Sequence, residues 1–192
     1  YDSRLQSATV TKTHIVNVPR EILPRKQGIH FGPVIHEGNT QGSEEEVVII
    51  KDLAQKLINI PYWPKDQGGS QKLIGWSDIL FVAPYNYQVN LLKTALNSDA
   101  RVGSVDKFQG QEAKIVFISM TASDPENIPR HKGFLFSRNR LNVGISRAEC
   151  ITFILFNPNL LTTSCQKIEE MRLINNFCKL LKYTIKDREA YS

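Results

Sequence analysis

The sequence predicts an α/β fold built on one doubly wound, largely parallel sheet, and three observations carry this prediction. Apolar, β-rich runs at 78–83, 113–122 and 151–156 have the pattern of strands buried on both faces. Segments with helical spacing alternate with these runs along the chain. The length of 192 residues suits one hydrophobic core, or one core with a small appendage.

The N-terminal part before the first helix is expected to be mostly irregular. Prolines end the first β-branched run, and prolines break strands by removing a hydrogen-bond donor. The expected elements are a polar lead-in at 1–13, a strand at His14–Val18, a loop at 19–30 and a second short strand at Gly32–His36.

Ser43 is predicted to open the first helix as its N-cap, with Glu46 three residues later completing a capping box. Apolar residues then recur at helical spacing until Pro61 ends the helix. We assign the acidic first turn, Glu44 to Glu46, to helix stability and not to chemistry, because carboxylates suit the positive end of the helix dipole.

The middle of the chain is predicted to hold a loop, a buried strand and a second helix. The loop covers Tyr62–Gly75, and the strand covers Asp78–Ala83. Pro84 suits the first turn of the helix that follows. A further apolar run at Arg101–Val105 precedes the most informative part of the sequence.

The C-terminal part is predicted to alternate strand and helix to its end. After a strand at Ala113–Ala122, the expected elements are a long loop at Ser123–Ser137, a helix over 139–148, a strand at Ile151–Phe156, a closing helix over 166–182 and a short tail.

Two stretches organise the chain, Val105–Glu112 (VDKFQGQE) and Asn139–Ala148 (NRLNVGISRA). The first connects two strands, and Gly110 within it would let the backbone approach an anion closely. In the second, Leu141, Ile145 and Ala148 recur at helical spacing, so at least one arginine must leave the core face. A guanidinium in that position suits phosphate.

VDKFQGQE followed by RLNVGISRAE resembles motifs V and VI of superfamily 1 helicases, in the branch that includes the nonsense-mediated-decay RNA helicase and related DNA helicase-nucleases. The family patterns are V-D-x-F-Q-G-x-E and R-L-N-V-A-x-T-R-A, so Gly144 and Ser146 replace the usual Ala and Thr. The strand at 78–83 with PYNYQ after it resembles motif IV. The likeness covers most of the chain and implies the second RecA-like motor domain of such a helicase.

The sequence contains no G-x-x-x-x-G-K-[ST] phosphate loop and no Asp-Glu pair of the Walker B kind. We therefore expect a single motor domain over 1–192, with lead-in 1–13, core 14–183 and tail 184–192, excised from a longer helicase. The resemblance implies that ATP lies in a cleft shared with the first RecA-like domain, which would hold Mg²⁺. The isolated chain is expected to show no measurable ATPase activity.

Residue roles on the nucleotide side follow from the resemblance. It implies that Arg147 is an arginine finger on the γ-phosphate, with Glu112 as a second catalytic residue and Gly110, Gln109 and Gln111 as cofactor-binding residues. Such fingers accelerate phosphoryl transfer by roughly 10³ to 10⁵ because they stabilise the charge that develops. The alternatives are a helix-end arginine in a surface ion pair and an ordinary turn glycine.

The resemblance also implies contacts with single-stranded DNA or RNA. Hydroxyl and ammonium groups suit phosphate oxygens, and the predicted nucleic-acid-binding residues are Ser104, Lys107, Tyr85, Gln88, Arg140 and Asn142. Arg140 and Asn142 have strong structural alternatives. A nuclease domain in the full-length chain is a further expected partner, although these 192 residues carry no nuclease carboxylate pattern.

Composition agrees with this interpretation without specifying it. The net charge of +5 is compatible with a polyanionic partner, but it is weak evidence alone. The odd count of three cysteines, with no C-x-x-C pair, argues against a disulfide framework or a zinc site and fits a cytoplasmic protein. No metal site and no membrane span are expected. The competing hypotheses are a degenerate RecA-like module that binds nucleic acid or protein without ATP turnover, and an unrelated doubly wound enzyme with a structural Arg147.

Overall fold

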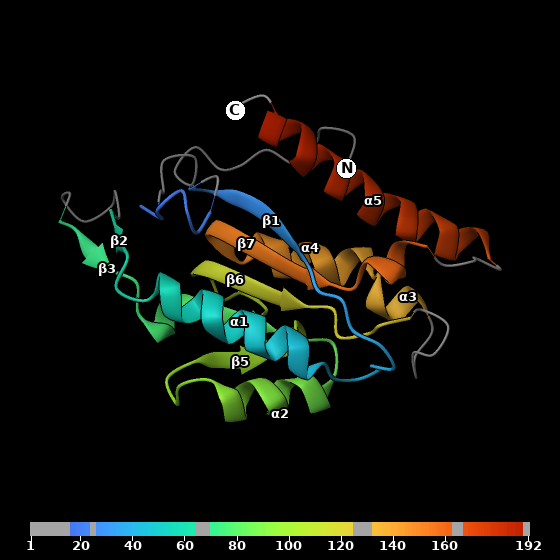
Figure 1. Ribbon diagram of the computed structural model, residues 1–192, viewed down its shortest axis with the longest axis horizontal. Coiled ribbons are helices and arrows are strands. Elements are labelled where there is room, and N and C mark those ends of the chain that lie inside the picture. Colours follow the sequence, from blue (N-terminus) through green and yellow to red (C-terminus); the bar gives the residue numbers. More distant parts are fainter. Residues whose placement is uncertain (1–15, 24–25, 64–69, 125–131, 163–166, 190–192) are drawn as a thin grey trace.

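A five-stranded parallel sheet in the order β1-β7-β6-β4-β5 forms the centre of the molecule (Figure 1). The computed structural model describes residues 16–23, 26–63, 70–124, 132–162 and 167–189. All four strand pairings are parallel, so the predicted fold class is confirmed. The strands are β1 (Gly28–Pro33), β4 (Ile79–Val82), β5 (Arg101–Gly103), β6 (Ala113–Ser119) and β7 (Ala148–Phe156).

Helices cover both faces of the sheet and divide the core into two clusters (Figure 1). One face packs against α1 (Glu44–Leu57) and α2 (Asn86–Ala95). The other packs against α4 (Arg138–Ser146) and α5 (Ile168–Glu189). Figure 1 shows α2 and β5 together at one edge of the molecule, with α5 at the opposite edge. None of the described helices combines the length and apolarity needed to cross a bilayer.

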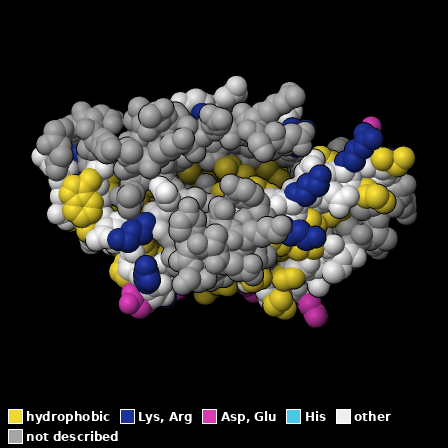
Figure 2. All heavy atoms as spheres, turned by 90° about the horizontal axis from the view of Figure 1, so that it is seen from above, with side chains coloured by type: hydrophobic (Ala, Val, Ile, Leu, Met, Phe, Trp, Pro, Cys, Tyr) yellow, Lys and Arg dark blue, Asp and Glu magenta, His cyan; other side chains and the backbone are white. Residues whose placement is uncertain are grey.

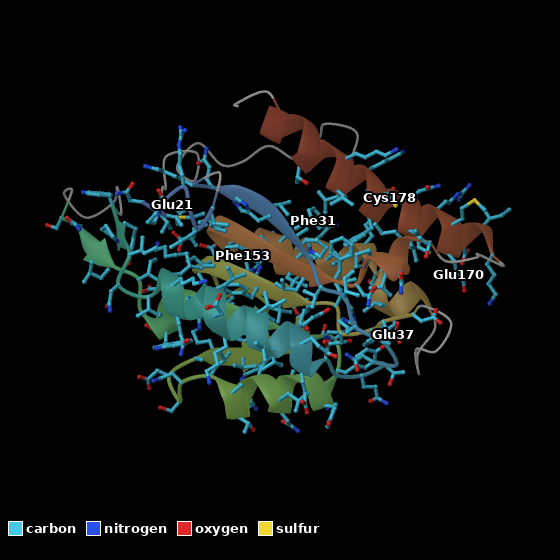
Figure 3. All side chains as sticks on the ribbon, in the orientation of Figure 1. Glu21, Phe31, Glu37, Phe153, Glu170 and Cys178 are labelled. Atoms are coloured by element: carbon cyan, nitrogen blue, oxygen red, sulfur yellow. The ribbon has the colours of Figure 1, made fainter. Side chains whose placement is uncertain are left out.

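Stacked aromatic rings join the central strands on the face that α1 covers. Phe81, Phe117 and Phe153 are register partners on β4, β6 and β7. Their ring centroids lie 5.4 and 4.6 Å apart, each pair nearly parallel. On the opposite face, Phe31 of β1 packs edge-on against Phe177 of α5 at 5.5 Å, and Figure 3 labels Phe31 and Phe153 on their adjacent strands. Such pairs contribute roughly 0.5–1.5 kcal/mol each beyond their buried area.

The first strand of the sheet lies earlier in the chain than predicted. β1 covers Gly28–Pro33, not Gly32–His36, and the expected loop therefore ends before Gly28. An edge strand tolerates glycine and proline, which is why this composition resembled a loop. Of the strand expected at 14–18, Val16 forms an isolated bridge with Tyr62, while residues 14–15 and the lead-in lie outside the described residues.

Two predicted loops contain short regular elements. β2 (Pro61–Tyr62) pairs antiparallel with β3 (Lys72–Leu73) in the region expected to be a loop. α3 (Lys132–Leu135) lies in the loop that was expected before α4. Residues 125–131 of that loop lie outside the described part of the chain. Each element is too short to produce a periodic pattern that sequence alone could reveal.

Several predicted boundaries also move. α2 begins at Asn86 with Tyr85 as its N-cap, so Pro84 lies before the helix and not in its first turn. Ala148 begins β7, although its spacing had placed it on the preceding helix. α5 continues to Glu189, which shortens the expected tail. Helix ends are set by tertiary contacts that local periodicity does not report.

Glu46 departs most from its predicted role. Ser43 caps α1 as expected, with its Oγ accepting from the Glu46 amide at 3.1 Å. The Glu46 carboxylate turns into the protein instead of completing the capping box, and it is fully buried. It accepts from the Ser119 hydroxyl and from the Thr121 amide at 3.1 Å, and it lies 3.4 Å from His36 Nε2. The Gln88 Oε1 accepts from the Ser43 amide in its place, at 2.8 Å.

Candidate functional site

The carboxyl ends of β4 and β6 diverge at a topological switch point. In the sheet, β4 lies between β5 and β6, and the chain passes first to β5 and then back across β4 to β6. Open α/β sheets bind ligands in the crevice at such a point. Here a hollow of about 300 Å³, called the carboxyl-edge hollow, is lined by Tyr85, Tyr87, Ser104, Phe134 and Arg140, among others.

Aromatic rings and a guanidinium line this hollow. Tyr87 is 57% exposed, and its ring lies so close to Gly42 that a Cβ there would come within 2.4 Å of it. The Phe134 ring lies 5.5 Å from the buried ring of Tyr85. The Arg140 guanidinium carbon lies 4.0 Å from the Phe134 ring centroid, and its Nη2 is 3.6 Å from Asp106 Oδ2. The arrangement offers an aromatic face and a cation to one ligand.

Three of the six predicted nucleic-acid-binding residues line the carboxyl-edge hollow, namely Tyr85, Ser104 and Arg140. Gln88 does not, because its amide is fully buried and bonds Ser43 and the Ser119 hydroxyl. That amide holds the start of α1 in this structure, and none of its surface is exposed to a strand.

The other two predicted strand contacts lie apart from the carboxyl-edge hollow. Lys107 is exposed, and its Nζ donates to the Val102 carbonyl at 3.0 Å on the outer side of β5. Asn142 lies half-buried on α4. Neither residue is among those lining the carboxyl-edge hollow.

The predicted nucleotide-side residues gather at the opposite end of the sheet. Gly110 and Glu112 precede β6, and Arg147 precedes β7. The Ala113 amide donates to the Arg147 carbonyl at 2.9 Å, which joins the two segments directly after Glu112. In parallel strands these positions share the amino-terminal edge. The backbones of Ala113 and Arg147 are therefore hydrogen-bonded at this edge, while the site roles of Gly110, Glu112 and Arg147 stay predictions.

Arg147 is half-buried and folds against its own helix. Its Nε donates to the Val143 carbonyl at 3.2 Å, and its Nη2 donates to the Ser146 hydroxyl at 3.1 Å. Both partners are neutral oxygens on α4 or at its end, and neither is Glu112. A guanidinium held by such weak, partly solvated bonds can turn toward an anion without breaking an ion pair.

Gly110 has the backbone conformation that its residue type permits. Its φ is +79°, and no heavy atom lies within 4 Å of the place a Cβ would take. The positive φ, and not crowding, therefore explains the glycine. Gln109 and Glu112 beside it are exposed, so this turn presents its backbone and polar side chains to solvent.

Arg101 at the start of β5 anchors the end of that turn. Its guanidinium donates to the Ser77 carbonyl at 3.1 Å, the Glu112 carbonyl at 3.2 Å and Gln111 Oε1 at 2.8 Å. Gln111 Nε2 donates in turn to the Lys107 carbonyl at 3.2 Å. Gln111 was predicted to bind the cofactor, but here its amide is engaged in holding the turn in shape.

A partly buried ion pair lies at the same edge of the sheet. Lys114 pairs with Glu149. Burial lowers the pKa of Lys114, but the hydrogen bond to Glu149 and the negative charge of that carboxylate outweigh it and hold this pKa above its usual value. Burial raises the pKa of the neighbouring Cys150 to about 12, so its thiol stays protonated. In the part of the chain that the structure describes, no three His, Cys, Asp or Glu side chains form a group that could hold a metal ion.

Sequence reasoning missed several residues of these two sites. Phe134 lines the carboxyl-edge hollow, the Asp106 carboxylate lies 3.6 Å from Arg140 there, and Arg101 fixes the turn at the other end. The sequence did offer a signal for Tyr87, because the aromatic pair Tyr85 and Tyr87 of the motif IV segment predicts rings at the carboxyl edge of the sheet. Phe134 and Arg101 offered none, because their neighbours come from segments distant in sequence.

Comparison with known proteins places the chain beside helicases. A family model described as "AAA domain" matches residues 1–159. The chain is 35% identical over 133 residues to the putative helicase mov-10-B.2 of Danio rerio, and the aligned region covers 62% of this chain and 13% of that protein. It is 36% identical over 92 residues to RNA helicase Mov10l1 of Homo sapiens, covering 44% and 8% respectively.

A longer match is less identical. The probable RNA helicase armi of Drosophila melanogaster is 28% identical over 169 residues, which is 83% of this chain and 14% of that protein. The chain therefore spans between 8% and 14% of the length of these three relatives.

Proposed function

The chain belongs to the AAA domain family, and from this premise we propose that it is the C-terminal motor half of an ATP-dependent nucleic-acid helicase. Supporting the proposal, the relatives described above are named as helicases or RNA helicases. The likeness of VDKFQGQE and RLNVGISRAE to motifs V and VI supports the second motor domain and the branch of the nonsense-mediated-decay helicase.

The observation that carries the proposal is the carboxyl-edge hollow with its exposed tyrosine and its guanidinium. Single strands bind through bases stacked on aromatic faces and through phosphates paired with cations. Tyr87 supplies the exposed face, Arg140 the cation and Ser104 a hydroxyl. Because none of these groups reads base edges in a groove, the proposed strand binding depends little on base sequence.

The amino-terminal edge would face the nucleotide held by the first motor domain. In the proposed mechanism the first domain holds the triphosphate and its Mg²⁺, the Gly110 turn presents backbone N–H groups, and Arg147 turns from its own helix toward the γ-phosphate. Charge that builds on the transferring phosphoryl group would be stabilised by that guanidinium. Glu112 would accept from the ribose or orient the finger.

One segment contributes to both ends of the sheet. Ser104 follows β5 in the carboxyl-edge hollow, and Glu112 precedes β6 at the amino-terminal edge. Asp106 within this segment lies 3.6 Å from the guanidinium of Arg140 on α4, the helix whose C-cap is Arg147. A change at the nucleotide would thus reach the strand site through two short segments that are joined by this ion pair.

Tyr87 provides the experiment that tests the strand site. Replacing Tyr87 with Ala in the full-length protein is expected to weaken single-strand binding about 5- to 150-fold, because stacking of one base contributes roughly 1–3 kcal/mol. Tyr87→Phe should retain most of the affinity. Fluorescence anisotropy with labelled oligonucleotides at fixed salt measures both. Equal affinity in Tyr87→Ala and the unmodified protein would remove the carboxyl-edge hollow from the strand path.

A module that binds nucleic acid or protein without turnover is the second candidate. The Arg147 side chain favours it, because this side chain lies on its own helix. Strand-stimulated ATP hydrolysis by the full-length protein separates the two, since the helicase hydrolyses ATP and the module does not.

A further inference from the structure

The outward face of α2 joins the carboxyl-edge hollow to a second hollow at the outer edge of the sheet. Asn86 and Tyr87 at the start of α2 line the first. Lys93 in its last turn lines the second, called the basic hollow, together with Asn97, Arg101, Lys107 and Gln111. α2 lies along β5 at this edge (Figure 1), and α2 contains no acidic residue.

The charged side chains that line the basic hollow are all cations. This hollow encloses about 460 Å³, and three of its lining residues, Lys93, Arg101 and Lys107, are cations while none is acidic. The nearby Asp99 belongs to the turn between α2 and β5, but it does not line the hollow. Three cations placed together without a carboxylate repel one another, so the hollow would be stabilised by an anion.

Hydrogen-bond donors remain available in this hollow. The guanidinium of Arg101 donates to two backbone carbonyls and one side-chain amide oxygen. Because these acceptors are neutral, they do not compensate its positive charge. Lys107 bonds one carbonyl and keeps two N–H groups. Lys93 is exposed at the end of α2, and its ammonium offers three donors. The hollow therefore suits an oxyanion that accepts several hydrogen bonds, as a phosphate does.

We propose that a nucleic-acid strand leaving the carboxyl-edge hollow runs along the outward face of α2 and places its phosphodiesters in the basic hollow. This inference rests on the proposed function of the carboxyl-edge hollow. Ten helical residues span about 15 Å, roughly four phosphates at the stacked spacing of about 3.4 Å. A single nucleotide could not occupy both hollows, whereas a strand can.

Side chains between the hollows support a strand over a nucleotide. Asn90 is exposed between Tyr87 and Lys93, and a neutral polar group of this kind suits phosphate and sugar oxygens. The ring nearest the basic hollow, Phe108, is 2% exposed and covered by Lys107, whose Nζ is 5.6 Å from its centroid. The basic hollow thus offers charge without a stacking face, which favours backbone contact over base contact.

Lys93→Gln in the full-length protein tests the proposal, with Lys93→Arg as the charge-preserving variant and Lys179→Gln on α5 as the matched control. Binding is measured across a salt series with two oligonucleotides, one long enough for the carboxyl-edge hollow alone and one several nucleotides longer. Loss of one phosphate contact lowers the slope of log affinity against log salt by about 0.7. We expect this loss with the longer strand, little change with the shorter, and no change for Lys93→Arg or Lys179→Gln.

Two outcomes would overturn the proposal. An unchanged salt slope for Lys93→Gln on the longer strand would show that α2 does not carry phosphates. Weaker binding of ATP with unchanged strand binding would assign the basic hollow to the nucleotide instead. Neither outcome alters the Tyr87→Ala result, so failure of this path and failure of the strand site remain separable.

Discussion

Replacing Arg147 with Ala in the full-length protein is expected to reduce ATP turnover by roughly 10³ to 10⁵ and to leave nucleotide affinity nearly intact. The guanidinium would act on charge that exists only in the transition state, so the loss falls on kcat and not on binding. Leaving its present bonds to Val143 and Ser146 costs little, because both are bonds to neutral, partly solvated oxygens. Steady-state turnover and equilibrium nucleotide binding measure the two quantities.

Arg172→Ala on the exposed face of α5 is the matched control, because it removes the same charge at a residue that lines neither hollow. It is expected to leave turnover unchanged. Arg147→Lys should recover only a small part of the activity, since an ammonium lacks the planar fork that matches phosphate. Turnover by Arg147→Ala at the normal rate would remove this residue from the mechanism.

Replacing Glu46 with Ala is expected to lower the free energy of unfolding by about 3–5 kcal/mol. The substitution leaves the Ser119 hydroxyl and the Thr121 amide without their buried acceptor. Thr121 is also held at φ 64°, a left-handed conformation that costs roughly 1–2 kcal/mol for a side chain of this kind. At roughly 2–4 °C for each kcal/mol in a chain of this size, the melting temperature should fall by about 6–20 °C.

Glu44→Ala separates burial from helix capping. Glu44 occupies the same first turn of α1 but is exposed, so its removal should cost only about 0.3–1 kcal/mol through the helix dipole. Glu46→Gln keeps a hydrogen-bond acceptor, so its loss of stability should lie between those of Glu46→Ala and Glu44→Ala. Thermal unfolding followed by circular dichroism measures all three. Similar melting temperatures for the two alanine variants would show that the buried network does not stabilise the fold.

The Glu46 network also connects the core to the strand site. Ser119 bonds Glu46 and Gln88, and it lines the carboxyl-edge hollow. His36 Nδ1 lies 2.6 Å from the Ser123 hydroxyl, so the loop after β1 is bonded to the loop after β6. The fully buried Gln88, expected to touch the strand directly, would instead influence strand binding by holding the floor of the hollow.

Much of the fold could be predicted from sequence because it depends on local patterns. The buried runs of β4, β6 and β7 are continuous and apolar, and α1 shows its N-cap and its apolar spacing plainly. β1 could not be placed, because the position of an edge strand along the chain is decided by its pairing, here with β7. β2, β3 and α3 contain two, two and four residues, which are too few for a hydrophobic pattern to repeat.

The amino-acid sequence by itself determined the fold class, the order of the main elements and the two motifs that carry the family resemblance. It could do so because apolar periodicity and two uninterrupted motifs are properties of neighbouring residues. Tertiary structure alone decided that Glu46 is buried, that Tyr87 is the exposed ring of the carboxyl-edge hollow, and that Lys93 lies beside Arg101 and Lys107. Burial and charge clustering depend on which distant segments the sheet brings together, and the spacing of residues along the chain does not contain that information.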